Sequence, residues 1–172
     1  MRLGAIGVEP MNLKPDFGAL GRTQGSIVVI TEHKGGCHCG NLRVQVQLTR
    51  PPADILIRSC ACSFCRSHGT RTVSDPAGQA DLWASDWNLV QHYRFGSRTA
   101  DYLFCRQCGV YVGAVCETPS GHRSVINTLC LGDREAFAQE PVRPDYDGEA
   151  TEARLARREA NWMPIVIHER EE

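Results

Sequence analysis

The sequence predicts a mainly β protein with one short helix near its C-terminal end. Short segments that are rich in β-branched residues, or that alternate between apolar and polar residues, recur at regular spacing with turn residues between them. Three clusters of cysteines lie between these segments, and closely spaced cysteines on turns are typical of metal sites. The length of 172 residues suits one domain with a core of its own.

The first half of the chain contains two predicted strands. Residues 26–31 form a short β-branched run that ends near residues 34–36 (Lys-Gly-Gly), which we interpret as a turn. Residues 42–48 alternate strictly between apolar and polar side chains, the pattern of a half-buried strand. A Pro-Pro pair at 51–52 then breaks the chain, and residues 68–80, with two glycines and a proline, are predicted to be a loop.

The second half contains further predicted strands and the helix. The strands are expected over residues 89–95, 99–104, 110–115 and 123–131. The first two flank a Gly-Ser turn and would form a hairpin that ends at Cys105. Residues 133–139 are predicted to form one or two helical turns. Residues 151–161 give the strongest helix pattern, with Thr151 as the cap.

Composition argues against two classes of partner. The formal charge of −1 and the pI near 6.6 provide no basic field, so we expect no nucleic-acid partner. No run of about 18 apolar residues is present, so no membrane span is expected, and Met1 to Leu20 lacks the order of a signal peptide.

Nine cysteines are an odd number, and their spacings close disulfide loops poorly. We therefore expect a cytoplasmic protein; its sequence specifies no oligomeric state.

Seven of the nine cysteines fall into the three clusters. They are Cys37, Cys39, Cys60, Cys62, Cys65, Cys105 and Cys108. A structural zinc has four protein ligands, whereas a catalytic zinc keeps one position open, so seven thiolates divide naturally into four and three, with two Zn²⁺ ions per chain. The three cysteines within residues 60–65 can reach one ion by themselves. The pairs within 37–39 and 105–108 would then close a structural site across a long loop.

Two alternatives remain for these clusters. Cys105 and Cys108 could form a thioredoxin-type redox pair, although that assignment needs a βαβ context, which the flanking sequence lacks. The three-cysteine group could be structural, with a fourth ligand from Cys116, Cys130 or His68. Cys116 and Cys130 lie in strand-like runs, however, where a free cysteine behaves as a small buried apolar residue.

The three-cysteine group predicts a class of chemistry. A zinc ion held by three thiolates carries a formal charge of −1, which disfavours the activation of water. Its open position suits a small thiol bound as thiolate, and a thiolate sulfur can attack a carbonyl carbon. We therefore expect a low-molecular-weight thiol and a small aldehyde as substrates. The candidates for carrying a proton to the new alkoxide are Ser63, between two ligands, and His68, three residues past Cys65.

Arginines also accompany the clusters along the sequence. They are Arg58, Arg66, Arg94, Arg98 and Arg106. One interpretation is a solvated face; the other is that some of them bind the carboxylates of an anionic ligand bidentately. The chain has neither a Gly-x-x-x-x-Gly-Lys phosphate loop nor a Gly-x-Gly-x-x-Gly motif after a strand, so nucleotide cofactors are not indicated.

The clusters and their neighbours resemble a known family. The segments that carry the resemblance are Gly-Gly-Cys-His-Cys-Gly at 35–40, Cys-Ala-Cys-Ser-Phe-Cys-Arg at 60–66, Tyr-Arg-Phe-Gly-Ser at 93–97 and Phe-Cys-Arg-Gln-Cys-Gly-Val at 104–110. They are similar to segments of the glutathione-dependent formaldehyde-activating enzyme family, which also includes centromere protein V. The resemblance covers residues 33–131, and leaves a leader at 1–32 and an extension at 132–172 that we expect to pack on the same domain.

The resemblance implies a fold like that of the Mss4 group, with coiled antiparallel β-sheets stapled by zinc. It implies a carbon–sulfur lyase that forms S-(hydroxymethyl)glutathione, with glutathione as co-substrate and formaldehyde as the aldehyde. It also implies that Cys37, Cys39, Cys105 and Cys108 are structural zinc ligands and that Cys60, Cys62 and Cys65 are catalytic zinc ligands. A non-catalytic, zinc-stabilised binding module is the alternative, and an enzyme of the same site with another thiol or aldehyde is a third possibility.

Overall fold

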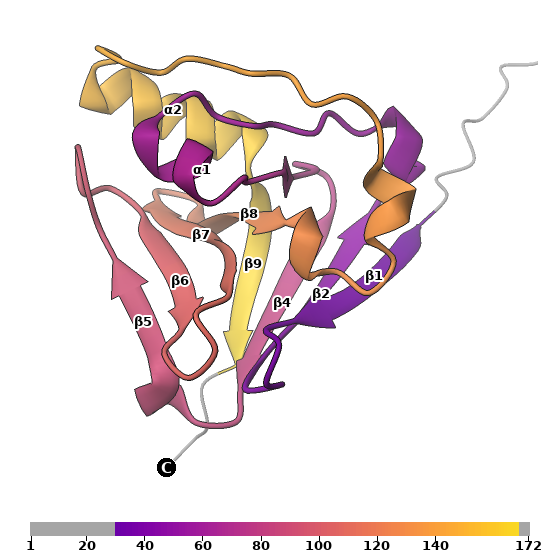
Figure 1. The fold of residues 1–172 in the computed structure, drawn as a ribbon. Coiled ribbons are helices and arrows are strands. Elements are labelled where there is room, and N and C mark those ends of the chain that lie inside the picture. The colour runs from indigo at the N-terminus through magenta and orange to yellow at the C-terminus, as the bar shows by residue number, and fades with distance from the viewer. Residues whose placement is uncertain (1–29, 169–172) are drawn as a thin grey trace, which may run out of the picture.

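The computed structural model describes residues 30–168, and the elements named here are those of this part of the chain (Figure 1). The strands are β1 (Thr31–Gly36), β2 (Leu42–Leu48), β3 (Thr72–Val73), β4 (Gln79–Ala84), β5 (Val90–Tyr93), β6 (Asp101–Cys105), β7 (Tyr111–Thr118), β8 (Gly121–Asn127) and β9 (Met163–His168). The α-helices are α1 (Ser63–Ser67) and α2 (Thr151–Asn161), and the 3-10 helices are η1 (Pro52–Asp54), η2 (Trp87–Leu89), η3 (Thr128–Cys130) and η4 (Arg134–Phe137). The mainly β class with a short C-terminal helix is thereby confirmed.

The strands form one open sheet in the order β1-β2-β4-β9-β8-β7-β6-β5, and β3 pairs with β8 beside this path. Neighbouring strands are antiparallel except for β4 and β9, which run parallel. The last strand therefore lies in the middle of the sheet and joins two antiparallel halves (Figure 1). Likeness to the Mss4 group stays a prediction.

The core is built from the apolar faces that the alternating segments provide. Leu42, Val44, Val46 and Leu48 of β2 are all buried, while the residues between them are exposed or half-buried, so the predicted half-buried strand is confirmed. Leu82 of the paired strand β4 is buried with them. Burial of this apolar face is the main favourable contribution to the stability of this half of the sheet.

The two α-helices lie at the same end of the sheet, where the chain from residue 140 to 150 also crosses (Figure 1). The helix predicted at residues 151–161 is present with the same bounds, although Ala150 holds the cap position and no side chain caps it. Helix α2 packs on the sheet through Leu155 and Trp162, which contact a small cluster that includes Ala114 of β7 and Val125 of β8. This packing fixes the helix against the middle of the molecule.

Two expectations for the first half of the chain need correction. Residues 34–36 are not a turn, because they belong to β1 and pair with β2. Gly35 and Gly36 serve close packing instead: a Cβ at Gly35 would collide with the backbone of Cys130, and one at Gly36 with the backbone of Leu42. The predicted loop at 68–80 contains β3 and the start of β4. Most of the strand predicted at 26–31 lies outside the described residues.

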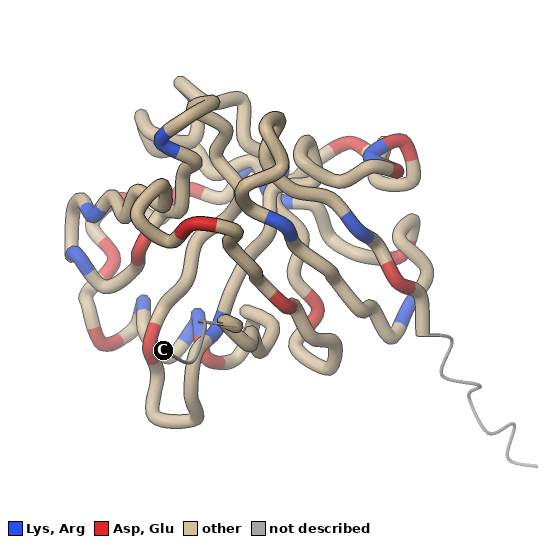
Figure 2. The backbone as a smooth tube through the Cα atoms, turned by 90° about the horizontal axis from the view of Figure 1, so that it is seen from below, with Lys and Arg blue, Asp and Glu red and all other residues tan. Residues whose placement is uncertain are grey.

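Charged residues of both signs are interspersed along the backbone, as Figure 2 shows from below. Within residues 30–168, no helix has the length and apolar character needed to cross a membrane.

Candidate metal centre and active site

The first site contains four cysteines from two distant turns. Cys37 and Cys39 follow β1, Cys105 is the last residue of β6, and Cys108 follows that strand; the four sulfur atoms lie within 4.8 Å of one another. The separations include 3.6 Å from Cys37 Sγ to Cys39 Sγ and 3.4 Å from Cys39 Sγ to Cys105 Sγ. Each turn reverses the chain at a glycine with positive φ, which is 80° at Gly40 and 73° at position 109.

This donor set fits a zinc ion. Four sulfurs at about 2.3 Å from a tetrahedral zinc would be about 3.8 Å apart, which is close to the two sulfur separations found. The backbone N–H of Leu42 donates to Cys37 Sγ at 3.1 Å, a bond that holds this sulfur in position. The four-cysteine site could therefore hold a metal that clips the β1–β2 connection to the β6–β7 connection.

The second site contains Cys60, Cys62 and Cys65, whose sulfur atoms also lie within 4.8 Å of one another. Cys62 caps the N-terminus of α1, since its Sγ accepts a hydrogen bond from the backbone N–H of Cys65 at 3.4 Å. The preceding segment is held on one side by residue 142, whose carbonyl accepts from Ser59 N at 2.8 Å, and on the other by Thr72, whose carbonyl accepts from Arg58 N at 3.0 Å. The three sulfurs are thus positioned by several backbone contacts.

Among residues 30–168, no fourth cysteine, histidine, aspartate or glutamate joins this second group. The three candidates for a fourth ligand have other contacts. Cys116 Sγ lies 3.7 Å from Arg158 Nη1, Cys130 Sγ donates to Asn127 O at 3.0 Å, and His68 Nδ1 lies 2.9 Å from Phe64 O. A tetrahedral metal held by these three sulfurs would therefore have one position without a ligand from residues 30–168.

Hydrogen bonding within the second group shifts the pKa values of two of its sulfurs in opposite directions. Hydrogen bonding from Cys65 lowers the pKa of Cys60 to about 6, and the same bond, together with burial, raises the pKa of Cys65. A group of thiols that holds one sulfur as thiolate at neutral pH is ready to exchange its remaining protons for a metal cation.

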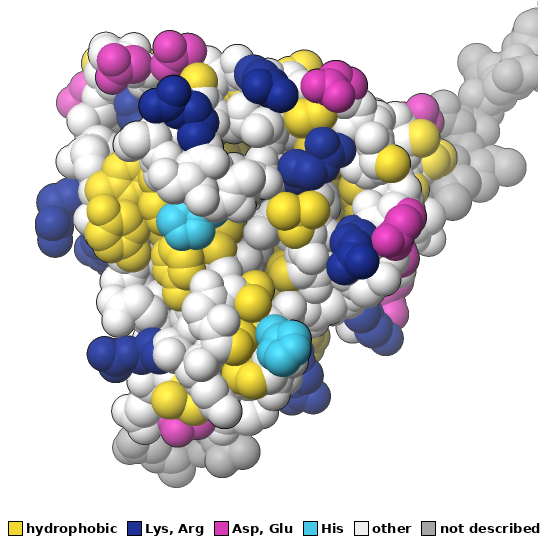
Figure 3. Space-filling model, in the orientation of Figure 1, with side chains coloured by type: hydrophobic (Ala, Val, Ile, Leu, Met, Phe, Trp, Pro, Cys, Tyr) yellow, Lys and Arg dark blue, Asp and Glu magenta, His cyan; other side chains and the backbone are white. Residues whose placement is uncertain are grey.

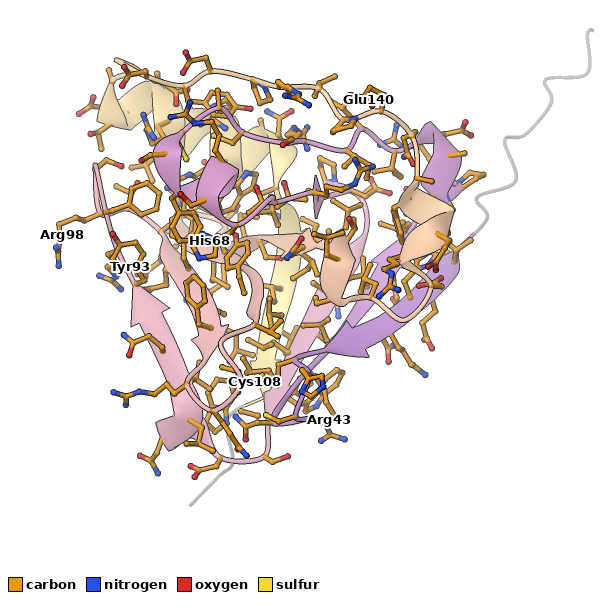
Figure 4. All side chains as sticks on the ribbon, in the orientation of Figure 1. Arg43, His68, Tyr93, Arg98, Cys108 and Glu140 are labelled. Atoms are coloured by element: carbon orange, nitrogen blue, oxygen red, sulfur yellow. The ribbon has the colours of Figure 1, made fainter. Side chains whose placement is uncertain are left out.

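The two sites lie at opposite ends of the sheet. Figure 4 labels Cys108 of the first site near the ends of β2 and β4, whereas His68, which ends α1 beside the second site, lies at the end where both helices are found.

The second site opens on a cavity of about 500 Å³, a size typical of small-molecule sites. All three of its cysteines line the cavity, together with Ser63 and the aromatic residues Phe95, Tyr102, Tyr111 and Trp162. Burial raises the pKa of Tyr102 to about 12 and also raises the pKa of Tyr111 above its ordinary value, so both hydroxyls stay protonated at neutral pH.

The two candidates for proton transfer occupy different positions. Ser63 is exposed to the cavity from the first position of α1. His68 does not line the cavity, since its ring stacks on Phe64 with ring centroids 4.4 Å apart. Figure 3 shows hydrophobic side chains gathered around a histidine on this face of the molecule, and Figure 4 labels His68 and Tyr93 there. The role of Ser63 and His68 in proton transfer stays a prediction.

The arginines that accompany the clusters in sequence separate in space. Arg58 and Arg66 line the cavity. Arg94 instead pairs with Asp101 at 2.6 Å on the surface, Arg106 donates to a backbone carbonyl at 3.4 Å, and Arg98 is exposed. The carboxylate-binding interpretation therefore applies only to the first two.

Sequence reasoning missed three cavity arginines of α2. They are Arg154, Arg157 and Arg158. Their spacing of three and four residues puts all three on one face of a helix, which is the signal that could have identified them. Tyr102 and Tyr111 of the cavity were missed as well, because an aromatic residue in a predicted strand is first interpreted as part of the hydrophobic core.

These features define a β-sheet protein with two cysteine groups that could each hold a metal ion, one of them open to a cavity of ligand size. Over residues 32–147 the chain matches the glutathione-dependent formaldehyde-activating enzyme family, and it belongs to that family. A crystal structure of a Rhodobacter sphaeroides protein is similar to it at 30% sequence identity, with a TM-score of 0.51. The similarity covers 64% of this chain and 99% of the Rhodobacter chain.

Proposed function

We propose that this chain is a zinc enzyme of the carbon–sulfur lyase type. It promotes the addition of glutathione, or a similar small thiol, to formaldehyde or another small aldehyde, and the reverse cleavage. The family match supports the reaction class. The observation that carries the proposal is that three clustered sulfurs without a fourth protein ligand, among the described residues, open on a cavity of ligand size.

The cysteines have different roles in this proposal. Cys37, Cys39, Cys105 and Cys108 would hold a structural zinc, and Cys60, Cys62 and Cys65 would hold the catalytic zinc. When bound there, the catalytic zinc would offer its open position to a thiol and lower that thiol's pKa, while the three thiolates leave the ion too electron-rich to favour the activation of water.

The cavity residues provide the remaining functions. In the addition, a carbon–sulfur bond forms as the carbonyl π bond breaks, and the resulting alkoxide oxygen takes up a proton. Ser63 is the group best placed to deliver that proton, and Tyr102 offers a second protonated hydroxyl on the same cavity. The aromatic walls limit the access of bulk water, which strengthens polar interactions with the alkoxide.

The test is exchange NMR on ¹³C-formaldehyde with glutathione, because the uncatalysed addition already occurs and only accelerated exchange counts. We expect the zinc-loaded protein to accelerate exchange and Cys62→Ser to lose the acceleration. Cys130→Ser is the matched control, since Cys130 lies outside both cysteine groups. A folded, fully loaded wild type that gives no acceleration would exclude this chemistry and leave the binding-module alternative.

A further inference from the structure

The cavity beside the three cysteines contains more positive charge than the carboxylates of residues 30–168 balance. Five arginines line it, against the carboxylates of Asp145 and Asp147. Asp145 is occupied within its own turn, where it accepts a hydrogen bond from the backbone N–H of Asp147 at 3.0 Å. The arginines of the cavity are Arg58, Arg66, Arg154, Arg157 and Arg158.

Glu149 accounts for two of these arginines. Its carboxylate accepts two parallel hydrogen bonds from Arg157, each 2.8 Å long, and lies 3.5 Å from Arg154 Nε. The guanidinium of Arg157 also stacks over the ring of Tyr146, with 3.6 Å from its Cζ to the ring centroid. Glu149 therefore fixes one wall of the cavity, and within residues 30–168 its carboxylate forms ion pairs with these two arginines and not with Arg58 or Arg158.

Arg58 and Arg158 have no such partner. Arg158 is 5% exposed, donates from Nη1 to Thr99 Oγ1 at 2.7 Å, and has a buried Nε without a hydrogen-bond partner within residues 30–168. Arg58 is half-buried, and its Nη1 is likewise buried and without a partner in that part of the chain. Arginine stays charged in proteins, and a buried charge without a counterion is costly, so these two groups call for an anion.

The cysteine group does not balance this charge. The five cavity arginines outnumber the carboxylates of Asp145, Asp147 and Glu149 by two, and three thiolates around one Zn²⁺ carry a formal charge of −1, so the proposed site retains net positive charge. Because Arg58 precedes Cys60 by two residues, this charge lies beside the proposed reaction centre. The planar fork of a guanidinium matches a carboxylate bidentately.

We propose that Arg58, with Arg158 of α2, forms a carboxylate subsite in this cavity, and that the substrate of the site carries a carboxylate. The proposal rests on the proposed function and narrows it to acidic substrates. The carboxylate can belong to the thiol, as in glutathione, or to the aldehyde, as in glyoxylate. Arg58 is then a specificity residue that binds substrate, and α2, which lies beyond the family match at 32–147, provides the second arginine.

The test measures binding without turnover. S-methylglutathione cannot act as a thiol, so its titration into the zinc-loaded protein by calorimetry reports the subsite alone, and its dimethyl ester is the matched ligand without carboxylates. Glyoxylate and acetaldehyde form the second pair of probes. We expect at least one acid to bind about tenfold or more tightly than its neutral counterpart, and Arg58→Met to abolish that difference. The pair that shows the difference identifies which substrate carries the carboxylate.

Two further variants separate recognition from folding. Arg58→Lys keeps the charge but loses the fork, and should recover only part of the affinity. Arg134→Met is the matched control, because Arg134 is exposed and does not line the cavity. Since Nη1 of Arg58 has no partner in the described chain, Arg58→Met should keep the melting temperature of the ligand-free protein or raise it.

Three results would overturn the proposal: equal binding of acids and neutral counterparts, unchanged acid binding by Arg58→Met, or loss of zinc as the sole effect of that variant. Formaldehyde exchange is measured separately on the wild type. If exchange is not accelerated but the acids still bind through Arg58, the proposed reaction fails and the subsite stands. If exchange is accelerated while acids show no preference, the subsite alone fails.

Discussion

Ser63 follows the cap residue of α1, between two of the proposed zinc ligands, and its side chain is exposed to the cavity. We expect Ser63→Ala to lower the accelerated rate of formaldehyde exchange by about 100-fold, the effect of losing a positioned proton donor. His68→Ala should change the rate less than about threefold, because a group outside the cavity lining has no direct path to the alkoxide. Exchange NMR on both variants and on their double variant measures this. Unchanged rates in all three would remove both residues from the mechanism.

Asp75 is a buried carboxylate that fastens the end of β2 to the turn before β4. It is 2% exposed and accepts hydrogen bonds from Thr49 N at 2.9 Å and Thr49 Oγ1 at 2.8 Å. Burial by itself would raise the pKa of Asp75, but these bonds, with one from Ala77 N, outweigh burial and hold the pKa below its ordinary value of 3.8.

Asp75→Asn should lower the free energy of unfolding by about 2 kcal/mol at pH 7, because hydrogen bonds to a charged acceptor are replaced by weaker ones. A group whose pKa is lower in the folded state contributes stability above its unfolded pKa, and loses that contribution as the pH falls through the folded value. The difference between variant and wild type should thus be constant from pH 7 to about 4.5 and shrink below about 3.8. Urea unfolding at several pH values measures it; a difference that grows on acidification would refute this assignment.

At the scale of elements, sequence patterns identified the segments whose burial is local. The alternation of apolar and polar residues predicts the strand at 42–48, and turn residues predict the hairpin around Gly96. The sequence did not predict strands β4 and β9, because β4 follows a stretch rich in turn residues and β9 contains Pro164 directly after a helix. Both strands are fixed by pairing with distant partners, which no local pattern encodes.

The cysteine groups could be predicted for a different reason. Thiolate spacing is chemical information in the sequence itself, and the four-plus-three division agrees with the two groups found in space. The arginine lining of the cavity could not be predicted in the same way, since Arg58 and Arg158 are a hundred residues apart in the sequence. They line the same cavity only because α2 packs on β7 and β8. The only signal in the sequence was the spacing of the three arginines of α2, which puts them on one face of the helix.

The close approach of β1 to the segment around residue 130 gives a prediction for an element. A Cβ at Gly35 would collide with the carbonyl oxygen and carbon of Cys130 and with Leu131 Cα, all backbone atoms that cannot move aside. We expect Gly35→Ala to destabilise the protein by about 1–3 kcal/mol. Gly132→Ala is the matched control, because its Cβ would come no closer than 3.3 Å to the carbonyl of Lys34. Equal midpoints in urea for the two variants would contradict this account of Gly35.

At the scale of the whole molecule, the four-cysteine group brings together the β1–β2 connection and the β6–β7 connection, which are far apart in the sequence. Cys39 and Cys105 are 66 residues apart, and their sulfurs lie 3.4 Å from each other. A structural zinc there would restrict the unfolded chain as well as stabilise the folded one.

Removing zinc with a chelator should therefore lower the melting temperature by about 10 °C or more, and adding zinc back should restore it. Cys108→Ser should show the same loss before any chelator is added, whereas Cys62→Ser should retain most of the stability because its site lies in one short segment. Differential scanning calorimetry distinguishes these cases. A melting temperature that does not respond to chelation would show that this group is not a metal staple.

The central place of β9 also sets the order in which the molecule can be completed during synthesis. Strands β4 and β8 leave the ribosome well before residues 163–168, yet β9 is the strand that lies between them. A nascent chain therefore carries two partial sheets whose facing edges stay open, and open edges invite pairing with other chains. The hazard ends only when the final strand arrives, so a ribosome that stalls between α2 and β9 would release a chain prone to aggregation rather than a slightly shortened protein.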